Sequence, residues 1–354
     1  MNNSTVKNKC GFLAIGAGGG NVCVPFYKAD YPCLFINSAK LDLDSLKEVE
    51  EKYKYHIPGG EGCNKDRKKS KELFRKDIDN IMNEIKEKLP CIEYLFVVGA
   101  AGGGTASGVL ASIKRIAISE LALKACIMVT ILPNTKNESI KALINAYETL
   151  AEIEQLEGAG ATIILDNDRN SNKLRINEMF FCYLDALLTN SSVSVLGNVD
   201  NAEVEELLSA SGMAIISKLG KDKSETQQLI STFRNNIYAP MEDDKVIKYM
   251  GLINAGQGKG IQIEDVYKAV GIPFDTYMGY EADATICILS GLSLPYGKMS
   301  EIKSIIDSNK DTIKNNLSAQ NSSRLSDSLG FFDDIIPVAK PKAEKNKNYR
   351  DLLF

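Results

Sequence analysis

The chain has no tryptophan and a single histidine, His56. One histidine excludes a metal cluster built from several imidazoles, and it rules out any Ser-His or Cys-His nucleophile pair that needs more than this residue. We expect His56 to have a structural or solvent-facing role. Histidine-centred metal or nucleophile chemistry is therefore not expected.

Paired cysteines and long apolar runs are also missing. The eight cysteines are scattered and never form CxxC, which is typical of reduced thiols in the cytoplasm. There is no signal peptide and no apolar run near the roughly 18 residues of a membrane span, so we expect a cytoplasmic protein without a membrane partner. The net charge of −4 gives no general reason to wrap nucleic acid.

The first half of the chain alternates two kinds of segment. Its 354 residues, 44% hydrophobic and 25% charged, suffice for two domains. Between about 11 and 165, short runs that are apolar at both alternating positions are separated by amphipathic segments such as 75–89 and 139–156. This predicts an α/β fold with a doubly wound parallel sheet. Ligands bind such sheets at the carboxyl ends of the strands, expected here at Ile15, Ile36, Val98, Ile131 and Leu165.

The second half predicts a smaller unit. Residues 174–196, apolar nearly all round, predict one long buried helix, and residues 202–220 predict another. The runs 246–256 and 282–293 predict strands of a second α/β unit, and a late helix is expected from Met299. The expected division is 1–172 for a first, ligand-binding domain, 173–197 for a central helix, 198–297 for a second domain and 298–354 for a C-terminal helix and basic tail.

Two apolar runs end in glycine clusters, at 16–20 and 102–104. Asn21 stands where the dinucleotide fingerprint needs its third glycine, and no Gly-Lys pair is followed by Ser or Thr as in a Walker A loop. Small residues still let backbone N–H groups converge on an anion, and a helix that begins just afterwards adds its positive dipole end. The hydroxyls of Thr105 and Ser107 could also donate to phosphate. Glycines used only for tight turns are the alternative, more so for the first cluster.

The second cluster carries a resemblance. "GGGTASG" at 102–108 is similar to the signature of the tubulin/FtsZ family of GTPases, with Ala106 at its middle glycine. Alanine keeps the backbone donors but restricts φ, so the loop must approach phosphate without a left-handed residue there. Between about 11 and 300, further stretches resemble the family's nucleotide loops in the same order, namely "GAGGGN" (16–21), "NSAK" (37–40), "GGEGCN" (59–64), "ILPNTKNES" (131–139) and "ILDNDRN" (164–170).

The resemblance implies a binding site for GTP and GDP. From the loops before residue 100 it takes Gly16, Gly18, Gly19, Gly20, Asn21, Asn37, Ser38, Gly60, Gly62 and Asn64. From the signature loop it takes Ala101, Gly102, Gly103, Gly104, Thr105, Ala106, Ser107 and Gly108. Pro133 and Glu138 fall on the ribose side, and Asn167 falls beside the base.

Phe181 and Asp185 are candidates for reading the base. They are four residues apart on one predicted helix face, and the family has a ring and an Asn or Asp at this spacing. A ring can stack on guanine, and a carboxylate accepts from its N1–H and exocyclic amine, so we expect GTP rather than ATP. Taken alone, such a pair is more often a core ring and an ordinary helix carboxylate.

An acidic loop completes the resemblance. "GNVDNAEVEELLSASGMAI" at 197–215 is similar to the family's catalytic loop, which implies catalytic roles for Asn198, Asp200 and Glu203. The two carboxylates would orient and polarise the attacking water. Mg²⁺ would bridge the β- and γ-phosphates mostly through water, so no protein ligand for the metal is expected.

The spacing of the acids predicts a polymer. If 174–196 is one helix, Asp185 and Asp200 are roughly 22 Å apart at about 1.5 Å per residue, too far to serve one nucleotide. We therefore expect the acidic loop of one subunit to complete the GTP site of the next. Such a head-to-tail contact joins unlike surfaces and makes an open homopolymer.

The C-terminal end suggests a branch of the family. Its tail carries Lys340, Lys342, Lys345, Lys347 and Arg350, in place of a long linker with a docking peptide. This resembles the plasmid- or phage-encoded TubZ branch, whose filaments segregate DNA through a DNA-bound adaptor. The tail would bind that adaptor, its DNA or a neighbouring subunit, or would be a solubilising end. An FtsZ-type cell-division GTPase, a GTP-binding scaffold without turnover and a dinucleotide-dependent oxidoreductase stay as alternatives.

Overall fold

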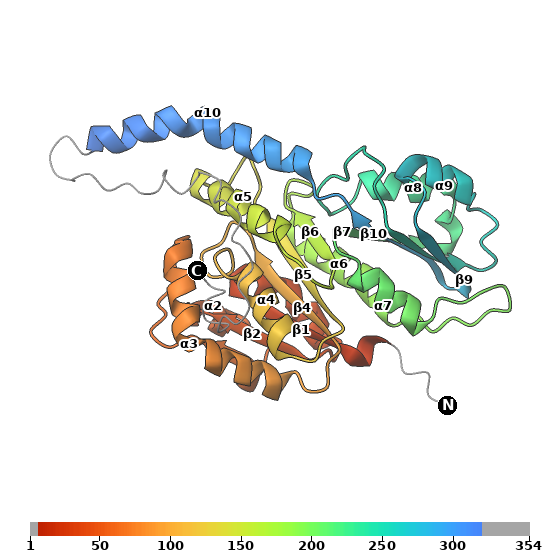
Figure 1. The fold of residues 1–354 in the computed structure, drawn as a ribbon, viewed down its shortest axis with the longest axis horizontal. Helices are drawn as coiled ribbons and strands as arrows, with labels where there is room; N and C mark the ends of the chain where they lie inside the picture. Colours follow the sequence, from red (N-terminus) through yellow and green to blue (C-terminus); the bar gives the residue numbers. More distant parts are fainter. Residues whose placement is uncertain (1–5, 321–354) are drawn as a thin grey trace.

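The computed structural model describes residues 6–320, and Figure 1 shows their arrangement. Ten strands form one sheet in the order β3-β2-β1-β4-β5-β6-β7-β10-β8-β9. The first six are parallel to their neighbours: β1 Cys10–Ile15, β2 Cys33–Asn37, β3 Lys54–His56, β4 Tyr94–Ala100, β5 Ala125–Leu132 and β6 Thr162–Asp166. All five strands predicted for this half are present, and the sequence reading missed the short β3.

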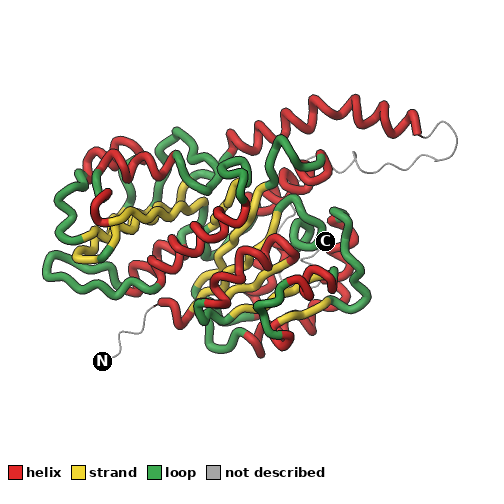
Figure 2. Tube along the Cα trace, turned by 180° about the vertical axis from the view of Figure 1, so that it is seen from behind, coloured by secondary structure: helices red, strands yellow, loops and turns green. Residues whose placement is uncertain are grey.

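Helices cover both faces of this parallel part. They are α1 Gly16–Lys28, α2 Lys40–Ser45, α3 Arg67–Lys88, α4 Leu110–Glu120, α5 Ile140–Glu154 and α6 Lys173–Leu188. Alternate residues of β1 enter different cores, since Phe12 packs with residues of α1 and α6, and Leu13 with residues of α3 and α4. Figure 2 shows the helices on either side of the strands from behind. The doubly wound α/β fold is confirmed.

The second half extends the same sheet. It consists of α7 Asn201–Ser209, β7 Met213–Gly220, α8 Thr226–Arg234, β8 Tyr249–Ala255, α9 Ile263–Val270, β9 Asp275–Ala282, β10 Ala284–Leu292 and α10 Tyr296–Gln320, with a short 3-10 turn at Lys221–Lys223. The first half has two such turns, at Val6–Lys9 and Glu51–Tyr53. β10 runs antiparallel to β7 and β8, while β8 and β9 are parallel.

The two halves of the sheet meet along a narrow seam. β6 pairs with β7 only at Thr162 and Met213. Farther along β6, the segment 237–239 takes over the pairing, with Ala239 N donating to Ile164 O at 2.8 Å. The second unit is thus continuous with the first sheet but joined to it by few hydrogen bonds.

Two helix predictions are wrong in extent. The helix expected over 174–196 is α6, which ends at Leu188 because Thr189 caps it and its hydroxyl donates to Asp185 O at 2.6 Å. The following polar residues form a loop in which Asn198 holds Ser194. The helix expected over 202–220 stops at Ser209, where Gly212, at φ +108°, turns the chain into strand β7.

Other boundaries shift less. α3 begins earlier than expected because the Asp66 side chain accepts from Lys69 N and caps it. The late helix α10 begins at Tyr296, and its first turns pack Ile302 and Ile306 on Leu143 and Ile144 of α5. In Figure 1 its later turns continue past the end of α5. No helix in the described part of the chain has both the length and the apolar character needed to span a membrane.

Candidate functional site

The two glycine clusters lie side by side at the carboxyl ends of the neighbouring strands β1 and β4. The first forms the opening turn of α1, so the helix begins inside the cluster and not after it. Glycines are needed because this turn presses on β4: a Cβ on Gly18 would lie 2.8 Å from Ala100 Cβ, and one on Gly19 would lie 2.3 Å from Val98 O. The free N–H groups of this first turn and the helix dipole point out of the sheet here.

The signature loop between β4 and α4 contains no left-handed residue. Ala106 therefore fits with negative φ, as the sequence predicted. Its methyl group is buried against the α4 side of the sheet, where a Cβ on Gly99 would come within 2.6 Å of it. The alanine adds packing without demanding a special backbone conformation.

Three alternate carbonyls of this loop are turned toward α3 and α5 and are held there by side chains. Asn145 Nδ2 donates to Gly103 O at 3.1 Å, Ser70 Oγ donates to Thr105 O at 2.5 Å, and Arg67 Nη1 donates to Ser107 O at 2.5 Å. The N–H and C=O of a trans peptide point in opposite directions. The N–H groups of Gly104, Ala106 and Gly108 therefore face away from α3 and α5.

These three N–H groups have no intramolecular acceptor among residues 6–320. Ala106 N lies beside the start of α1, since a Cβ on Gly16 would be 3.7 Å from it. Donors from the signature loop and from the first turn of α1 thus converge on one place, which is what a di- or triphosphate requires.

The hydroxyls of the signature loop have partners within the subunit. Thr105 Oγ1 is 3.0 Å from Asn37 Oδ1 and 2.8 Å from Ser38 Oγ, and Ser107 Oγ donates to Gly103 O at 2.7 Å. Both hydroxyls serve the loops themselves, because each has one proton and it is engaged. Donation to phosphate would require both hydroxyls to exchange these partners, and it stays a prediction.

The two loops from the edge of the sheet close over this place. Ser38 Oγ contacts Cys63 Sγ at 3.3 Å, and Gly60 lies so near Ser38 that a Cβ would be 2.6 Å from its carbonyl oxygen. The His56 ring nitrogen Nε2 lies 2.8 Å from Gly60 O and 3.3 Å from Ser38 O, a structural role. Gly62 N donates to Ser38 O at 2.9 Å.

The segment 64–65 lies directly on the signature loop. Asn64 and Lys65 both have left-handed φ, and a Cβ on Gly104 would lie 2.8 Å from Lys65 N. Lys65 Nζ reaches Glu138 at 3.6 Å. All four loops that precede the ribose-side loop therefore meet at one end of the sheet.

The ribose-side and base-side loops lie next to each other at the ends of β5 and β6. Asn134 Nδ2 donates to Asn167 O at 3.2 Å, and Thr135 donates to the carboxylate of Asp168 through both its N and its hydroxyl. Pro133 lies against Gly102, where a Cβ would come within 3.2 Å of Pro133 Cγ. These contacts bring Pro133 and Asn167 to the same end of the sheet as the glycine clusters.

Two ion pairs brace these loops. Partial burial favours the neutral form of Glu138, but Lys173 at 3.0 Å and Lys65 outweigh it and hold the pKa of Glu138 below its ordinary value. On α10, Lys298 Nζ is 2.5 Å from Asp168 and 3.5 Å from Asp166, with a side chain only 4% exposed. The C-terminal helix is thereby fixed to the base-side loop.

Phe181 and Asp185 do not lie at this end. The Phe181 ring is 5.1 Å from that of Phe26, near the far end of α1, and Asp185 Oδ1 accepts from Tyr31 OH at 2.8 Å. Tyr31 directly precedes β2, so Asp185 is level with the amino ends of the strands, on the order of 20 Å down α1 from its glycines. The assignment of Phe181 and Asp185 to the base is therefore wrong. The two residues share a helix face, as predicted, but their turns of α6 lie too far from the phosphate loops.

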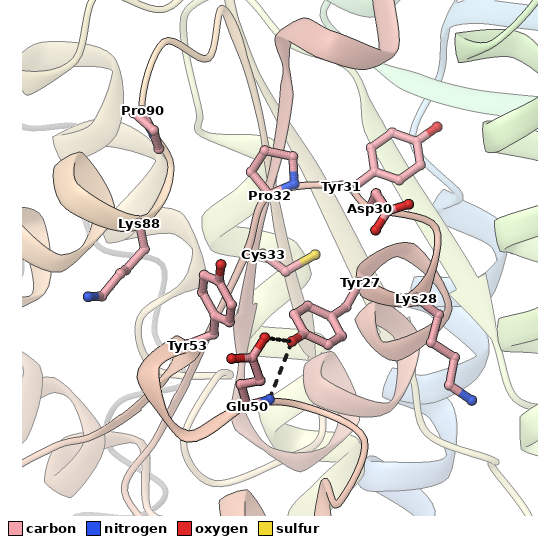
Figure 3. Close-up of a pocket in the computed structure, with 10 residues that line it drawn as sticks. All are labelled: Tyr27, Lys28, Asp30, Tyr31, Pro32, Cys33, Glu50, Tyr53, Lys88 and Pro90. Carbon is pink, nitrogen blue, oxygen red and sulfur yellow. Dashed lines mark hydrogen bonds between the residues drawn. The ribbon is translucent and has the colours of Figure 1, made fainter.

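We call the amino ends of the parallel strands the lower end of the sheet, and their carboxyl ends the upper end. A cavity of about 550 Å³ opens near Tyr31 at the lower end (Figure 3). Its lining comprises Tyr27, Lys28, Asp30, Tyr31, Pro32, Cys33, Glu50, Tyr53, Lys88 and Pro90. Glu50 stands between Tyr27 and Tyr53 and accepts from the Tyr27 hydroxyl at 3.3 Å. Lys28 and Lys88 pair with neighbouring glutamates at 2.6 Å each. Its charged groups are largely paired, and it is separate from the glycine clusters.

The acidic loop lies at the lower end too. Asp200 caps α7 and forms a capping box with Glu203: Asp200 Oδ1 accepts from Glu203 N at 3.0 Å, and Glu203 Oε2 accepts from Asp200 N at 2.8 Å. Asn198 is exposed and bonds Ser194. Partial burial and the carboxylates of Asp200, Asp275 and Glu206 raise the pKa of Glu203 above its ordinary value.

Contacts of α7 fix the position of that loop. Glu205 accepts from Tyr94 OH at 3.0 Å and pairs with Lys124 at 2.7 Å, at the first residue of β4 and just before β5. The glycines follow the last residue of β4. At about 3.3 Å per residue, the seven residues of β4 separate the two ends by roughly 23 Å. One subunit cannot bring its own acids to its own phosphate loops.

Comparison with known proteins identifies the architecture. A model of the tubulin/FtsZ family, GTPase domain, matches residues 12–174. The chain is 30% identical over 293 residues to the tubulin-like protein TubZ of a Clostridium botulinum C phage, covering 81% of this chain and 80% of that protein. The chain belongs to the tubulin/FtsZ family of GTPases.

Solved structures agree with this membership. The C-terminally truncated TubZ of Clostridium botulinum phage c-st superposes with a TM-score of 0.77 at 28% identity, over 87% of this chain and 99% of that one. A GTPγS-form protofilament of Bacillus thuringiensis serovar israelensis TubZ shares the fold with a TM-score of 0.74 at 14% identity, over 90% and 96% of the two chains. This membership rules out the alternative hypothesis of a nicotinamide-dependent oxidoreductase.

Several residues that contact the loops of this site were not predicted from the sequence. Arg67 and Ser70 stand on the same helical stripe as Phe74 and Ile78, so two polar residues on an apolar face were the available signal. Asn145 on the buried face of α5 is a similar case. Lys298 gives no local signal for its role, because its buried partners Asp166 and Asp168 lie more than 120 residues away in the sequence.

The described residues contain no group of three or more His, Cys, Asp or Glu side chains arranged to hold a metal ion. The donors that converge at the glycine clusters are N–H groups, which suit phosphate oxygens. Such a site suits Mg²⁺ carried on the phosphates of a nucleotide.

Proposed function

We propose that this GTPase forms head-to-tail filaments in which the acidic loop of one subunit completes the GTP site of the next. The observation that carries the proposal is the placement of the phosphate loops and the acidic loop at opposite ends of the same strands. A heterologous contact that joins these two ends does not close on itself and gives an open polymer. Hydrolysis then depends on assembly.

The lower end offers apolar surface for such a contact. Val195 is fully exposed, Phe274 is 83% exposed and Ile272 is 80% exposed. Val195 precedes Asp200 by five residues, and Phe274 adjoins Asp275, whose charge acts on Glu203. At the upper end, Leu41 and Leu174 are also exposed. Apolar side chains around two complementary polar sites are typical of a specific protein interface.

In the assembled site, the roles divide between two subunits. The N–H groups of the signature loop and of α1 bind the phosphates of GTP, and Mg²⁺ neutralises charge on the β- and γ-phosphates. Asp200 and Glu203 from the neighbour orient and polarise the attacking water, and Asn198 shapes their loop. Phosphoryl transfer needs such positioning and charge neutralisation more than covalent help.

Asn177 is a better placed reader of the base than Asp185. α1 and α6 run in the same direction, and Phe181 of α6 packs beside Phe26 of α1. One turn nearer the phosphate loops, Asn177 therefore lies level with Val22, next to Asn21. It is 9% exposed, and its side chain makes no hydrogen bond to the other described residues. Its amide has a donor and an acceptor, as the edge of guanine requires.

The base assignment has a direct test. We expect Asn177→Leu to weaken GTP binding at least tenfold, with little change in the weak binding of ATP, because one buried hydrogen-bonding pair is worth about 1–2 kcal/mol. The matched variant Asp185→Asn should leave both affinities unchanged. A loss of GTP binding in Asp185→Asn with none in Asn177→Leu would reverse the assignment.

Three finer statements belong to the proposal. Residues 1–172 bind nucleotide, 173–197 contain the central helix, 198–297 supply the acids and 298–354 form the C-terminal helix and tail. All eight cysteines are free thiols, which supports a cytoplasmic protein. The similarity to a phage TubZ supports segregation of plasmid or phage DNA through a DNA-bound adaptor.

The adaptor hypothesis rests on the tail, whose basic residues lie outside the described part of the chain. Deletion of 340–354 should leave GTP-dependent assembly intact and reduce recruitment of adaptor-bound DNA to filaments, measured by co-sedimentation. Unchanged recruitment would count against a role for the tail in that contact.

Assembly and turnover test the proposed function together. Light scattering and phosphate release are measured after GTP addition over a range of protein concentrations. We expect both signals to appear above one shared critical concentration. Turnover that is proportional to protein concentration, with no threshold, would show that each subunit hydrolyses GTP alone.

A further inference from the structure

We infer that Ser70, Asn145 and Arg67 are positioning residues for phosphate binding, although none of them faces the nucleotide. The inference rests on the proposed GTP site and goes beyond it, because these side chains act from behind the signature loop. Each holds one carbonyl, and each carbonyl fixes the N–H group on the other side of its peptide.

The geometry is regular along the loop. The held carbonyls belong to Gly103, Thr105 and Ser107, every second residue. Every second peptide therefore presents its N–H on the opposite side, at Gly104, Ala106 and Gly108. A free loop of small residues would sample many peptide orientations, since glycines restrict the backbone little. The three side chains select the orientation in which the donors converge.

The supports are themselves rigid. Ser70 is fully buried, and Asn145 is 4% exposed. Asn145 Nδ2 also donates to Lys65 O at 3.1 Å, so one amide group holds both the signature loop and the loop that lies over it. The amide thereby fixes the two loops relative to each other.

Arg67 is anchored on three sides. Its Nε pairs with Glu148 at 2.9 Å and its Nη2 with Glu152 at 2.5 Å, while Nη1 lies 2.6 Å from Thr149 Oγ1. With the guanidinium fixed on α5, its Nη1 also donates to Ser107 O. Two carboxylates also keep the positive charge of Arg67 on the rear side of the loop.

The role predicts an effect on phosphate affinity that exceeds any effect on folding. A donor that is already oriented loses no conformational entropy when the ligand binds. A peptide that has lost its support becomes ordered only on binding, and this loss of entropy weakens the affinity. Loss of one rear hydrogen bond, worth about 1 kcal/mol, corresponds to roughly a fivefold to tenfold loss of affinity. The affinity for guanosine, which has no phosphate, should not change.

The test uses the full chain and a matched pair of variants. Ser70→Ala removes a buried hydroxyl that holds a carbonyl, and Ser290→Ala removes a buried hydroxyl that has no partner. Affinities for GTP, GDP and guanosine are measured at a temperature where circular dichroism shows each variant folded. We expect Ser70→Ala to bind GTP and GDP about tenfold more weakly, with guanosine unchanged, and Ser290→Ala to match the wild type.

A second variant keeps the test decisive if Ser70→Ala does not fold. Asn145→Asp is close in shape but replaces the donor with an acceptor, so the carbonyl of Gly103 is repelled. We expect a larger loss than for Ser70→Ala, again confined to GTP and GDP. Equal losses for guanosine and GTP, or no loss at all, would overturn the positioning role. Failure of the wild type to bind GTP would instead refute the proposed function.

Discussion

The two ends of the sheet are built differently. At the carboxyl ends of the strands, the buried side chains of Ser70, Asn145 and Lys298 brace the signature loop and the base-side loop, and the free N–H groups of the signature loop face away from them. At the amino ends, Asp200 is exposed and Glu203 is half-buried, and their hydrogen bonds inside the subunit are those of an ordinary helix cap. The upper end is thus organised for its ligand within one chain, while in the proposed filament the carboxylates of the lower end act on the nucleotide of another chain.

The difference explains how one fold separates binding from turnover. Binding needs preorganised donors, which a single subunit supplies. In the proposed mechanism turnover also needs an acid near the γ-phosphate, and roughly 23 Å of strand separates the acids of a subunit from its own phosphate loops. Mutations at the upper end should therefore change nucleotide affinity and stability, and mutations at the lower end should change turnover and assembly.

The largest effect on stability is expected at the upper end, from Lys298→Met. This change leaves Asp166 and Asp168 without their buried cation, which costs about 3 kcal/mol of unfolding free energy. Chemical denaturation measures it. The control Glu301→Gln, which removes an exposed partner of the same lysine, should cost less than about 1 kcal/mol. Equal effects would mean that the buried cluster does not brace the base-side loop.

The same cluster gives a pH dependence. Burial favours the neutral form of Asp168, but Lys298 and Thr135 outweigh it and hold the pKa of Asp168 below its ordinary value. A carboxyl group with a lowered folded pKa stabilises the protein fully above its unfolded pKa, about 3.9, and loses this as the pH falls toward the folded value. We expect the stability gap between wild type and Lys298→Met to be constant near neutral pH and to shrink as the pH falls and the carboxyl group becomes protonated in the variant, since a neutral carboxyl group no longer needs the lysine. A gap that does not shrink on acidification would assign it to another interaction.

At the lower end, Asp200→Asn should reduce GTP turnover about a hundredfold or more, the range of a positioned acid or base. Asparagine is as good a helix cap as aspartate, so α7 stays capped and the melting temperature should barely change. Phosphate release and GTP affinity are measured in parallel. Weakened GTP binding in this variant would break the division between the two ends.

The apolar rim of the lower end should control assembly. Phe274→Ser removes a side chain that is 83% exposed, so unfolding free energy should change little. We expect a roughly tenfold higher critical concentration, equivalent to about 1.4 kcal/mol per contact. An unchanged critical concentration would contradict a role for Phe274 in the contact between subunits.

The smallest effect is expected from Ala106→Gly. The backbone at 106 needs no left-handed conformation, so glycine should keep GTP affinity within about threefold. The lost methyl contact and the added freedom of the unfolded chain should cost about 1 kcal/mol of stability. Abolished GTP binding would refute the description of the signature loop given above.

The sequence predicted the parallel half of the fold well because local patterns determine it. Runs such as 94–98 and 126–131 are apolar on both faces, and the glycine clusters follow them directly. The helix predicted over 202–220 failed because apolar residues continue across Ser209, and only Gly212 marks the turn into β7. Apolar content alone does not distinguish a helix from a buried strand.

Residues of the site were predicted where their role is local and missed where it is tertiary. The glycines, Ala106 and the acidic loop were predicted from motifs of consecutive residues that resemble those of the family. Asp185 was wrongly assigned to the base because a four-residue spacing shows that two residues share a helix face. It does not show how far along the helix they lie from the phosphate loops. Arg67 and Lys298 act through contacts far apart in the sequence, which no local pattern encodes.

The central claim is that the acids of one subunit act on the GTP of another, and a single-turnover mixing experiment tests it. Asp200→Asn subunits are loaded with γ-labelled GTP and mixed with unlabelled wild-type subunits in a large excess of unlabelled GTP, which dilutes any label that dissociates. The account predicts that labelled phosphate appears once wild type is added, because wild-type acids reach the GTP held by the variant. Label that stays as GTP in mixed filaments would contradict it.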